Sequence, residues 1–430
     1  MNTLQDLRAT LDAHAADVHN NATTARVAAV EGRARVVRRR RAAGVGAVAV
    51  LAVVAASGVS LLVGDRSPVP ADRQLIGKVA PATMESLGYT YHFAKGVEGG
   101  EKHATIRLRA SDEPRLVTWA SDAAEVGILG TADAFHVRSR ATDFDDFVLV
   151  EAGAPSELSV RAGGADSAIA VYELGDERPA GLTVDGMTFR EQVGSDRLVD
   201  GVVGEPGDLD VSMQITLPEG RFRLAEYCTG VATEDRLWVN VGVADQGPSA
   251  SGDCSDDGFD PGAEGQSTWY EPGQLGQPGD TVTLRTWVSK RVDGPVVDSM
   301  PGVRLGLALY LVAEPAAVVA GWDMPQLYEH EGHTWSFASV DEAPAGARRA
   351  IVTNTESAVR LVVASFSGAG RLTTVAFREP RSGGSDHVTA MGNGSDMVGF
   401  LEQGEGASLT VRGDPAPTTR MGFALYERVD

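Results

Sequence analysis

The stretch DFVLVEAGAPSELSVR, residues 146–161, aligns without a gap onto MVGFLEQGEGASLTVR, residues 397–412. The alignment keeps a glutamate, a glycine, two aliphatic positions and an arginine: Glu151 on Glu402, Gly153 on Gly404, Leu158 on Leu409, Val160 on Val411 and Arg161 on Arg412. The segment GDTVTLR, residues 279–285, follows the same pattern less closely. Self-similarity of this kind predicts a repeated architecture.

Two further motifs occur three times in the same order. The first has the form Gly-x-Thr-aromatic and stands at residues 88–91, 186–189 and 332–335. The second has the form apolar-Ala-aliphatic-Tyr and stands at residues 169–172, 307–310 and 423–426. Three ordered motifs in three copies indicate three related units, and we predict their ranges as 85–176, 177–315 and 316–430.

Each unit has the pattern of antiparallel strands. In HATIRLRA, residues 103–110, Ala104, Ile106 and Leu108 alternate with polar residues, as in a sheet with one buried face. The aligned segments EAGAPSEL and EQGEGASL join apolar runs through glycine-containing turns, which is a hairpin signal. We therefore predict a mainly β protein with three repeated antiparallel β-sandwich domains, jelly-roll-like in character. The Gly-x-Thr-aromatic and Ala-x-Tyr motifs should form first and last strands, with their rings in the core.

An uncharged run of 23 residues, 42–64, precedes the repeats. As a helix it would span about 34 Å at about 1.5 Å per residue, enough for a bilayer core of about 30 Å. Arg38–Arg41 stand at its amino end, so the positive-inside rule predicts a single-pass transmembrane helix with a cytoplasmic N-terminus and extracytoplasmic repeats. The alternative is a cleaved signal peptide ending near Ala56, but a signal peptide has a shorter basic start than residues 1–41.

The predicted cytoplasmic segment, residues 1–41, carries an apolar stripe of Leu4, Leu7, Leu11 and Val18 at helical spacing. One amphipathic helix cannot bury its stripe alone, so we expect it to meet the membrane, a copy of itself or a cytoplasmic partner. Residues 65–84 are interpreted as a linker. The chain has a net charge of −21, and its arginine-rich start leaves the repeats more acidic still. This charge argues against nucleic acid as a partner.

The middle unit is longer than the others and holds both cysteines, Cys228 and Cys254. In an oxidising compartment the pair favours one disulfide, worth about 3 kcal/mol through the loop it closes. Two free thiols are the alternative.

The segment DCSDDGFDPGAE, residues 253–264, fits part of a calcium-loop template. Asp253, Ser255, Asp257 and Glu264 fall at positions 1, 3, 5 and 12 of an EF-hand-like loop, where hard oxygen ligands surround the cation. Asp260 and Pro261 depart from that template, and flanking helices are absent from the sequence pattern. An acidic solvated loop is the competing interpretation, so the sequence predicts no cofactor, with calcium here as the alternative.

Catalytic signatures are weak. The chain lacks a Gly-x-Ser-x-Gly elbow, an HExxH motif and zinc-ligand spacing of cysteine and histidine. The densest candidates are the cluster His330-Glu331-Gly332-His333 and the cluster Ser385-Asp386-His387. The first looks like a substituted strand position, and the second is local where a triad is normally assembled from distant segments. We therefore predict that the protein is not an enzyme.

The layout of an LRATLDAHAADVH opening, then TTARVAAVEGRARVVRRRR and an Ala/Val-rich span, resembles single-pass, type II membrane proteins of high-GC Gram-positive bacteria with exported β-sandwich repeats. It is similar, too, to membrane-anchored anti-sigma factors. The resemblance covers about 65 residues and implies an anchor with an exported domain. It also implies signalling across the membrane.

Three functions follow as hypotheses. The first is a non-enzymatic binding or spacer array at the cell surface, whose partner would be a cell-wall glycan or a surface protein. The second is a transmembrane, anti-sigma-like regulator that senses through its ectodomain. The third is a cell-wall hydrolase.

Overall fold

The computed structural model describes residues 73–429 except 100–102, 112, 124, 125, 131–135, 140–142, 151, 153–155, 162, 185, 186, 231–236, 245, 246, 255–265, 379–384 and 412. The segment Pro70–Asp430 forms one compact unit. The predicted cytoplasmic segment and the predicted span 42–64 lie outside the described residues. Within the described residues we find no helix with the length and apolarity that a membrane crossing demands.

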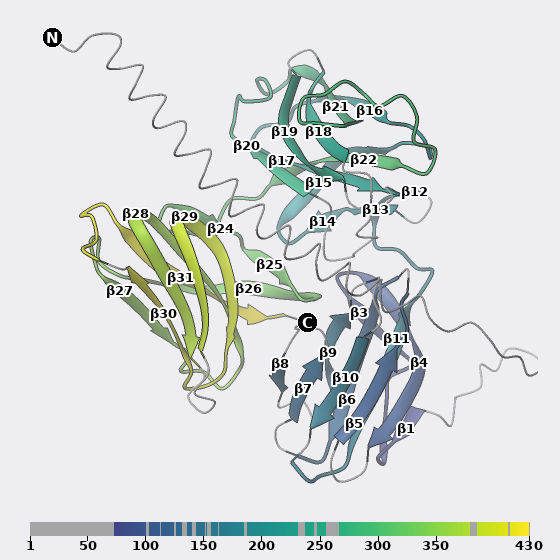
Figure 1. Ribbon diagram of the computed structural model, residues 1–430, viewed down its shortest axis with the longest axis vertical. Coiled ribbons are helices and arrows are strands. Elements are labelled where there is room, and N and C mark those ends of the chain that lie inside the picture. The colour runs from purple at the N-terminus through teal and green to yellow at the C-terminus, as the bar shows by residue number, and fades with distance from the viewer. Residues whose placement is uncertain are drawn as a thin grey trace, which may run out of the picture. The chain divides into compact units, whose positions relative to one another are not determined.

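The described chain is mainly β, and its sheets form three repeated sandwich units (Figure 1). The first unit contains β1 (Gln74–Leu75), β2 (Lys78–Val79), β3 (Thr83–Ser86), β4 (Tyr89–Gly99), β5 (His103–Leu108), β6 (Arg115–Ser121), β7 (Val126–Gly130), β8 (His136–Ser139), β9 (Asp143–Val150), β10 (Ser156–Arg161) and β11 (Ser167–Leu174). The second contains β12 (Gly181–Val184), β13 (Met187–Arg190), β14 (Gln192–Val193), β15 (Asp196–Val203), β16 (Asp210–Thr216), β17 (Arg221–Thr229), β18 (Leu237–Val243), β19 (Gly247–Cys254), β20 (Gln266–Tyr270), β21 (Thr281–Ser289) and β22 (Arg304–Val312). The third contains β23 (Ala317–Val319), β24 (Trp322–Met324), β25 (Leu327–His330), β26 (His333–Glu342), β27 (Arg349–Thr353), β28 (Arg360–Arg378), β29 (Ser385–Leu401), β30 (Gly406–Val411) and β31 (Arg420–Arg428).

The first two sandwiches have the same strand order. In the first, a five-stranded sheet β3-β4-β11-β6-β9 packs against a four-stranded sheet β5-β10-β7-β8. In the second, the corresponding sheets are β14-β15-β22-β17-β20 and β16-β21-β18-β19. All strand pairs with a stated register are antiparallel, as the short connections predicted.

The third sandwich reaches the same pairing with fewer, longer strands. The first part of β28, Arg360–Ser367, pairs with β31, whereas its last part, Thr373–Arg378, pairs with β30. The partner strand β29 follows β28 along both parts. Each of these long strands therefore takes the place of two shorter strands in the other sandwiches, and this unit is closer to a half-barrel.

Alternating strands confirm the period-two interpretation. In β5, Ala104, Ile106 and Leu108 are buried and lie in the core between the two sheets. In β16 the burial alternates along the whole strand, because its other face meets solvent. The alternation in HATIRLRA is therefore confirmed as that of a strand with one buried face.

The aligned segments that opened the sequence comparison are not hairpins. β9 pairs with β6, whereas β10 pairs with β5 and β7 in the opposite sheet. The chain crosses from one sheet to the other between them. The hairpin prediction was wrong because a short glycine-containing connection serves equally well to cross between sheets as to return along one.

A short hairpin precedes the other strands of each unit, and we call it the leading hairpin: β1–β2, β12–β13 and β23–β24. It covers the outer face of the five-stranded sheet, or of its counterpart in the third unit, with apolar side chains such as Leu75, Phe189 and Val319. The last strand of each unit is therefore buried on both faces, as β11, β22 and β31 show. This explains the continuous apolar runs of the Ala-x-Tyr motif.

Small residues make room for the leading hairpins. A Cβ atom on Gly306 would lie 3.0 Å from the side chains of Met187 and Phe189, and one on Gly422 would lie 2.7 Å from Val319. The motif alanines are fully buried beside them. The predicted core rings Tyr172, Tyr310 and Tyr426 are 0% exposed, and they do lie on the last strands as expected.

The Gly-x-Thr motifs occupy two different hairpins. In the first and third units they lie in the β3–β4 and β25–β26 hairpins. In the second unit Met187–Phe189 belongs to the leading hairpin, and the counterpart of β3–β4 is β14–β15. We call β3–β4, β14–β15 and β25–β26 the edge hairpins. Each motif therefore begins the second strand of a hairpin, and none begins a first strand.

Candidate functional site at the disulfide-linked end of the second sandwich

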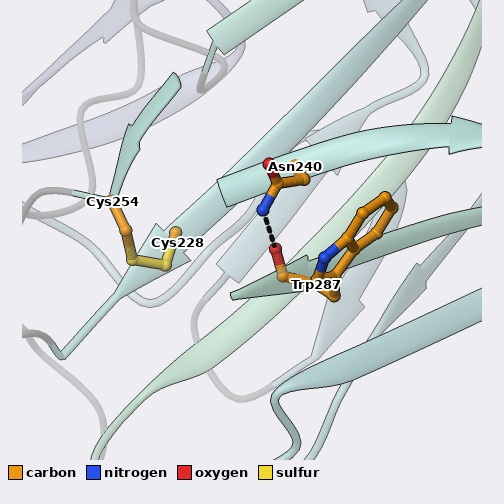
Figure 2. The surroundings of a disulfide bond; sticks show 4 residues. All are labelled: Cys228, Asn240, Cys254 and Trp287. Atoms are coloured by element: carbon orange, nitrogen blue, oxygen red, sulfur yellow. Dashed lines mark hydrogen bonds between the residues drawn. A yellow bond between two sulfur atoms is a disulfide. The ribbon is translucent and has the colours of Figure 1, made fainter. Parts of the chain in front are cut away.

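The predicted disulfide joins Cys228 and Cys254, whose Cα atoms are 5.2 Å apart (Figure 2). Cys228 lies on β17 in the five-stranded sheet, and Cys254 ends β19 in the four-stranded sheet. The bond therefore links the two layers of one sandwich. Both cysteines pack in an apolar cluster with Val239 and Leu305. The disulfide thus stabilises the framework from which the segment 255–265 departs.

A carboxyl group is buried two residues before the first cysteine. Glu226 shares the inward face of β17 with Leu224 and Cys228, because side chains alternate along a strand. The residue is 3% exposed, and among the described residues its Oε2 has no hydrogen-bond partner. Burial alone raises the pKa of Glu226 to about 8. The carboxyl is therefore protonated at neutral pH.

A short hydrogen bond lies in the same core. The hydroxyls of Ser249 and Tyr270 are 2.5 Å apart, and Ser249 Oγ is also 3.2 Å from the carbonyl of Val241. Burial raises the pKa of the Tyr270 phenol, and the negative charge that Glu226 can carry raises it further. This region thus combines a carboxyl group that burial keeps neutral at neutral pH with a phenol whose ionisation burial further disfavours.

Asn240 ties the outer face of the four-stranded sheet to the connection that follows it. Its Nδ2 donates to the carbonyl of Trp287 at 3.3 Å (Figure 2). The same Nδ2 donates to Ser289 Oγ at 2.8 Å. Its Oδ1 accepts from Ser251 Oγ at 2.8 Å and from the amide of Asp293 at 3.1 Å. The side chain is fully buried and fully bonded, which is the condition for a stable buried amide.

The predicted calcium ligands are not brought together in the described part of the chain. Asp253 lies on β19, where its backbone pairs with Trp238. Ser255, Asp257 and Glu264 lie outside the described residues. Within residues 73–429 as described, no three acidic, histidine or cysteine side chains gather around one metal position. The calcium loop stays a prediction.

The histidine cluster lies at the turn of the β25–β26 edge hairpin. Burial, and then the nearby His333, lowers the pKa of His330. Burial raises the pKa of Glu331. His333 Nε2 lies 3.3 Å from the carbonyl oxygen of Phe147. His333 Nε2 also lies 3.8 Å from Asp146 Oδ1, and the His333 and Phe147 ring centroids are 3.9 Å apart, so the cluster packs against β9 of the first sandwich.

The second sequence candidate lies on one long strand of the third sandwich. Ser385, Asp386 and His387 are consecutive residues of β29, and their backbones pair with Arg378, Phe377 and Ala376. A cavity of about 510 Å³ lies in the first sandwich beside His92 and Glu177, whose Nε2 and Oε2 atoms are 3.1 Å apart. Its other charged wall residues are carboxylates.

Sequence reasoning missed Glu226 and Asn240. A signal for Glu226 existed, because the alternation of RFRLAEYC places it in register with Leu224 and Cys228 on the buried face. Asn240 had no such signal. Its partners come from three different segments of the second unit.

No family model matches the chain, and no curated protein matches it. Among solved structures, the CUB1-EGF-CUB2 domains of rat MASP-1 share 13% identity over 53% of this chain and 96% of that chain, with a TM-score of 0.15. The oxalate decarboxylase of Bacillus subtilis at pH 4.6 shares 11% identity over 88% of this chain and 87% of that chain, with a TM-score of 0.14. Likenesses this distant carry no argument about fold or function.

Proposed function

We propose that the protein is a membrane-anchored, extracytoplasmic and non-enzymatic array of three β-sandwich modules. The array binds a partner at the cell surface or acts there as a spacer. The modules are jelly rolls in this proposal, because strands of two packed sheets alternate along the chain in the same order in the first two units. The anchor is the apolar run 42–64, with residues 1–41 in the cytoplasm. Its partner is a cell-wall glycan or another surface protein.

The observation that carries the proposal is the Cys228–Cys254 disulfide. Both cysteines of the chain are used in it, and structural disulfides are typical of protein segments outside the reducing cytosol. Glu226, two residues before Cys228, is almost wholly shielded from solvent, so we assign this carboxyl a structural role.

Protease accessibility tests the location. Intact cells that carry an epitope after Asp430 are treated with protease, with and without membrane permeabilisation. We expect the epitope to be lost from intact cells while an epitope before Met1 survives until permeabilisation. Protection of the carboxyl-terminal epitope in intact cells would overturn the proposed topology.

Cosedimentation tests the binding. Full-length protein in detergent is mixed with isolated cell-wall sacculi and, separately, with surface-protein extract cross-linked in place. Retention of the protein by either material supports the binding array. The material that retains it identifies the class of partner. Release of soluble fragments from the sacculi would instead favour the hydrolase.

A further inference from the structure

The edge hairpin β25–β26 contacts the edge hairpins of the other two sandwiches within the compact unit Pro70–Asp430. Each is topologically the first hairpin of its sandwich: β3–β4, β14–β15 and β25–β26. The β25–β26 turn is tight, with φ of +50° at Glu331 and +83° at Gly332, as in the turns favoured by two-residue hairpins. The same structural element from every repeat is therefore present at these contacts.

Glu329 on β25 joins the third sandwich to the second. Its carboxylate accepts from Arg190 Nη1 at 3.1 Å and from Nη2 at 2.6 Å, and Oε1 also accepts from the amide of Gly194 at 2.8 Å. The Arg190 side chain is 4% exposed and that of Glu329 is 14% exposed. Removing one partner of a buried pair leaves an uncompensated charge, so this contact is costly to break.

The backbone of β25 is held at the same place. The amide of Leu327 donates to Ser195 Oγ at 2.7 Å. A Cβ atom on Gly194 would lie 2.7 Å from the carbonyl oxygen of Leu327, so the β14–β15 turn can approach this closely only with glycine there. The strand β25 is thus held both by this close backbone contact and by the buried Glu329–Arg190 ion pair.

The first sandwich meets the same hairpin on its other side. Ser86 Oγ, at the end of β3, donates to the carbonyl of Gly332 at 2.7 Å. Ser86 is 2% exposed. Arg190 Nη1 also lies 3.4 Å from the carbonyl oxygen of Leu87 in the β3–β4 turn. One guanidinium therefore reaches groups of both the first and the third sandwiches.

A ring contact and an ion pair add further contacts between the first and third sandwiches. The rings of His333 and Phe147 are 3.9 Å apart between centroids, and Arg428 Nη1 lies 2.6 Å from Asp146 Oδ1. Arg428 also lies over the Phe147 ring at 5.7 Å. Residues of both β26 and β31 in the third sandwich thus contact β9 of the first sandwich.

We propose that the edge hairpins form one intrachain joint, in which β25–β26 is the docking element and the Glu329–Arg190 pair is the centre, since Glu329 contacts the second sandwich and Arg190 also reaches the first. The joint holds the modules as one body, whereas modules connected only by linkers move independently. Modules in a fixed relation can present a binding surface made of several repeats. The joint does not depend on the proposed cell-surface function, since it concerns contacts within one chain.

Hydrogen–deuterium exchange of the full-length chain in detergent, read by mass spectrometry, tests the joint. In Glu329→Ala, peptides that contain Gly194 and Leu327 should exchange at least tenfold faster than in the wild type. Arg190→Ala should give the same result and should also speed exchange at Leu87. Peptides from β30, which is remote from the joint in its sheet, should exchange as before.

Asp210→Asn is the matched control. It weakens the bidentate pair between Asp210 and Arg285, with distances of 2.7 and 2.8 Å, which lies within the second sandwich alone. Exchange at the edge hairpins should be unchanged in this variant. If Glu329→Ala does not fold, Glu329→Gln decides, because it removes the charge and keeps the shape. Wild-type exchange at both hairpins in the folded Glu329 variant would overturn the joint.

Discussion

The hydroxyl of Tyr310 donates a hydrogen bond of 3.0 Å to the backbone carbonyl of Arg190. In the first sandwich, Tyr172 makes the same kind of bond to the carbonyl of Pro81, also at 3.0 Å. In both cases a tyrosine on the last strand fastens the chain just where it leaves the leading hairpin. The repeated motif thus encodes a connection between the two ends of a unit.

Tyr310→Phe should destabilise the second sandwich. The Arg190 carbonyl would lose its buried donor, and a loss of about 1–2 kcal/mol is expected. Urea denaturation followed by hydrogen exchange at β22 would measure it. Tyr172→Phe is the matched variant and should weaken β11 while leaving β22 unchanged. Equal stability of β22 in Tyr310→Phe and the wild type would contradict this role.

Gly306→Val should displace the leading hairpin of the second unit. The new side chain would meet Met187 and Phe189, since even a Cβ lies at 3.0 Å. Overpacking a filled core costs about 1–3 kcal/mol. Faster exchange of Gly181–Arg190 with an unchanged β18 would show the displacement. Gly279→Ala offers a contrast, because a Cβ there meets nothing within 4 Å, although its φ of +89° adds strain.

Removing the disulfide should loosen the second sandwich. The double change Cys228→Ala and Cys254→Ala releases a loop with a sequence separation of 26 residues. The expected loss is about 3 kcal/mol. Denaturation of wild type with and without reductant gives the same comparison without mutation. A reductant effect that persists in the double variant would show another cause.

Stability should fall as pH rises from about 4.5 to about 8 through Glu226. The unfolded carboxyl loses its proton near its ordinary value of 4.5, whereas the folded one keeps it until about pH 8. The folded state therefore binds more protons in this window, and each pKa unit corresponds to about 1.4 kcal/mol. Above pH 8 this contribution becomes constant.

Glu226→Gln isolates that contribution. The amide stays neutral at every pH, so the variant should gain stability relative to wild type as pH rises across this window. Denaturation at pH 5, 7 and 8.5 would measure the difference. Parallel curves for the two proteins would show that Glu226 is not shielded as described.

Calcium separates the two interpretations of residues 253–264. A solvated acidic loop predicts no change in melting temperature on addition of calcium or chelator. A calcium loop predicts a rise that Asp257→Asn and Glu264→Gln remove. Thermal unfolding with magnesium as the control cation distinguishes them.

The sequence alone predicted the antiparallel β class, three related units and the buried motif tyrosines. These features follow from local alternation and from repetition, both of which are visible along the chain. It did not predict the leading hairpins, because their partners lie far away on the last strand. The Gly186 motif begins the second strand of the leading hairpin, whereas the other two copies begin the second strand of an edge hairpin, and the short motif alone does not distinguish the two.

The candidate site was less predictable than the fold. Cys228 and Cys254 could be paired because they are the only cysteines. Asn240, however, depends on bonds to β19, to β21 and to the connection after it, and no spacing in sequence announces such a network. The Glu329 contacts are longer-ranged still, since they join separate sandwiches.

The leading hairpin of each unit covers the outer face of that unit's own larger sheet. This cover belongs to the same repeat, so most of the apolar outer face of each larger sheet is buried by residues of its own unit. The small glycine and alanine residues beneath each hairpin leave the space that it occupies, so a copy of the repeat carries the cover together with the strand that the cover protects.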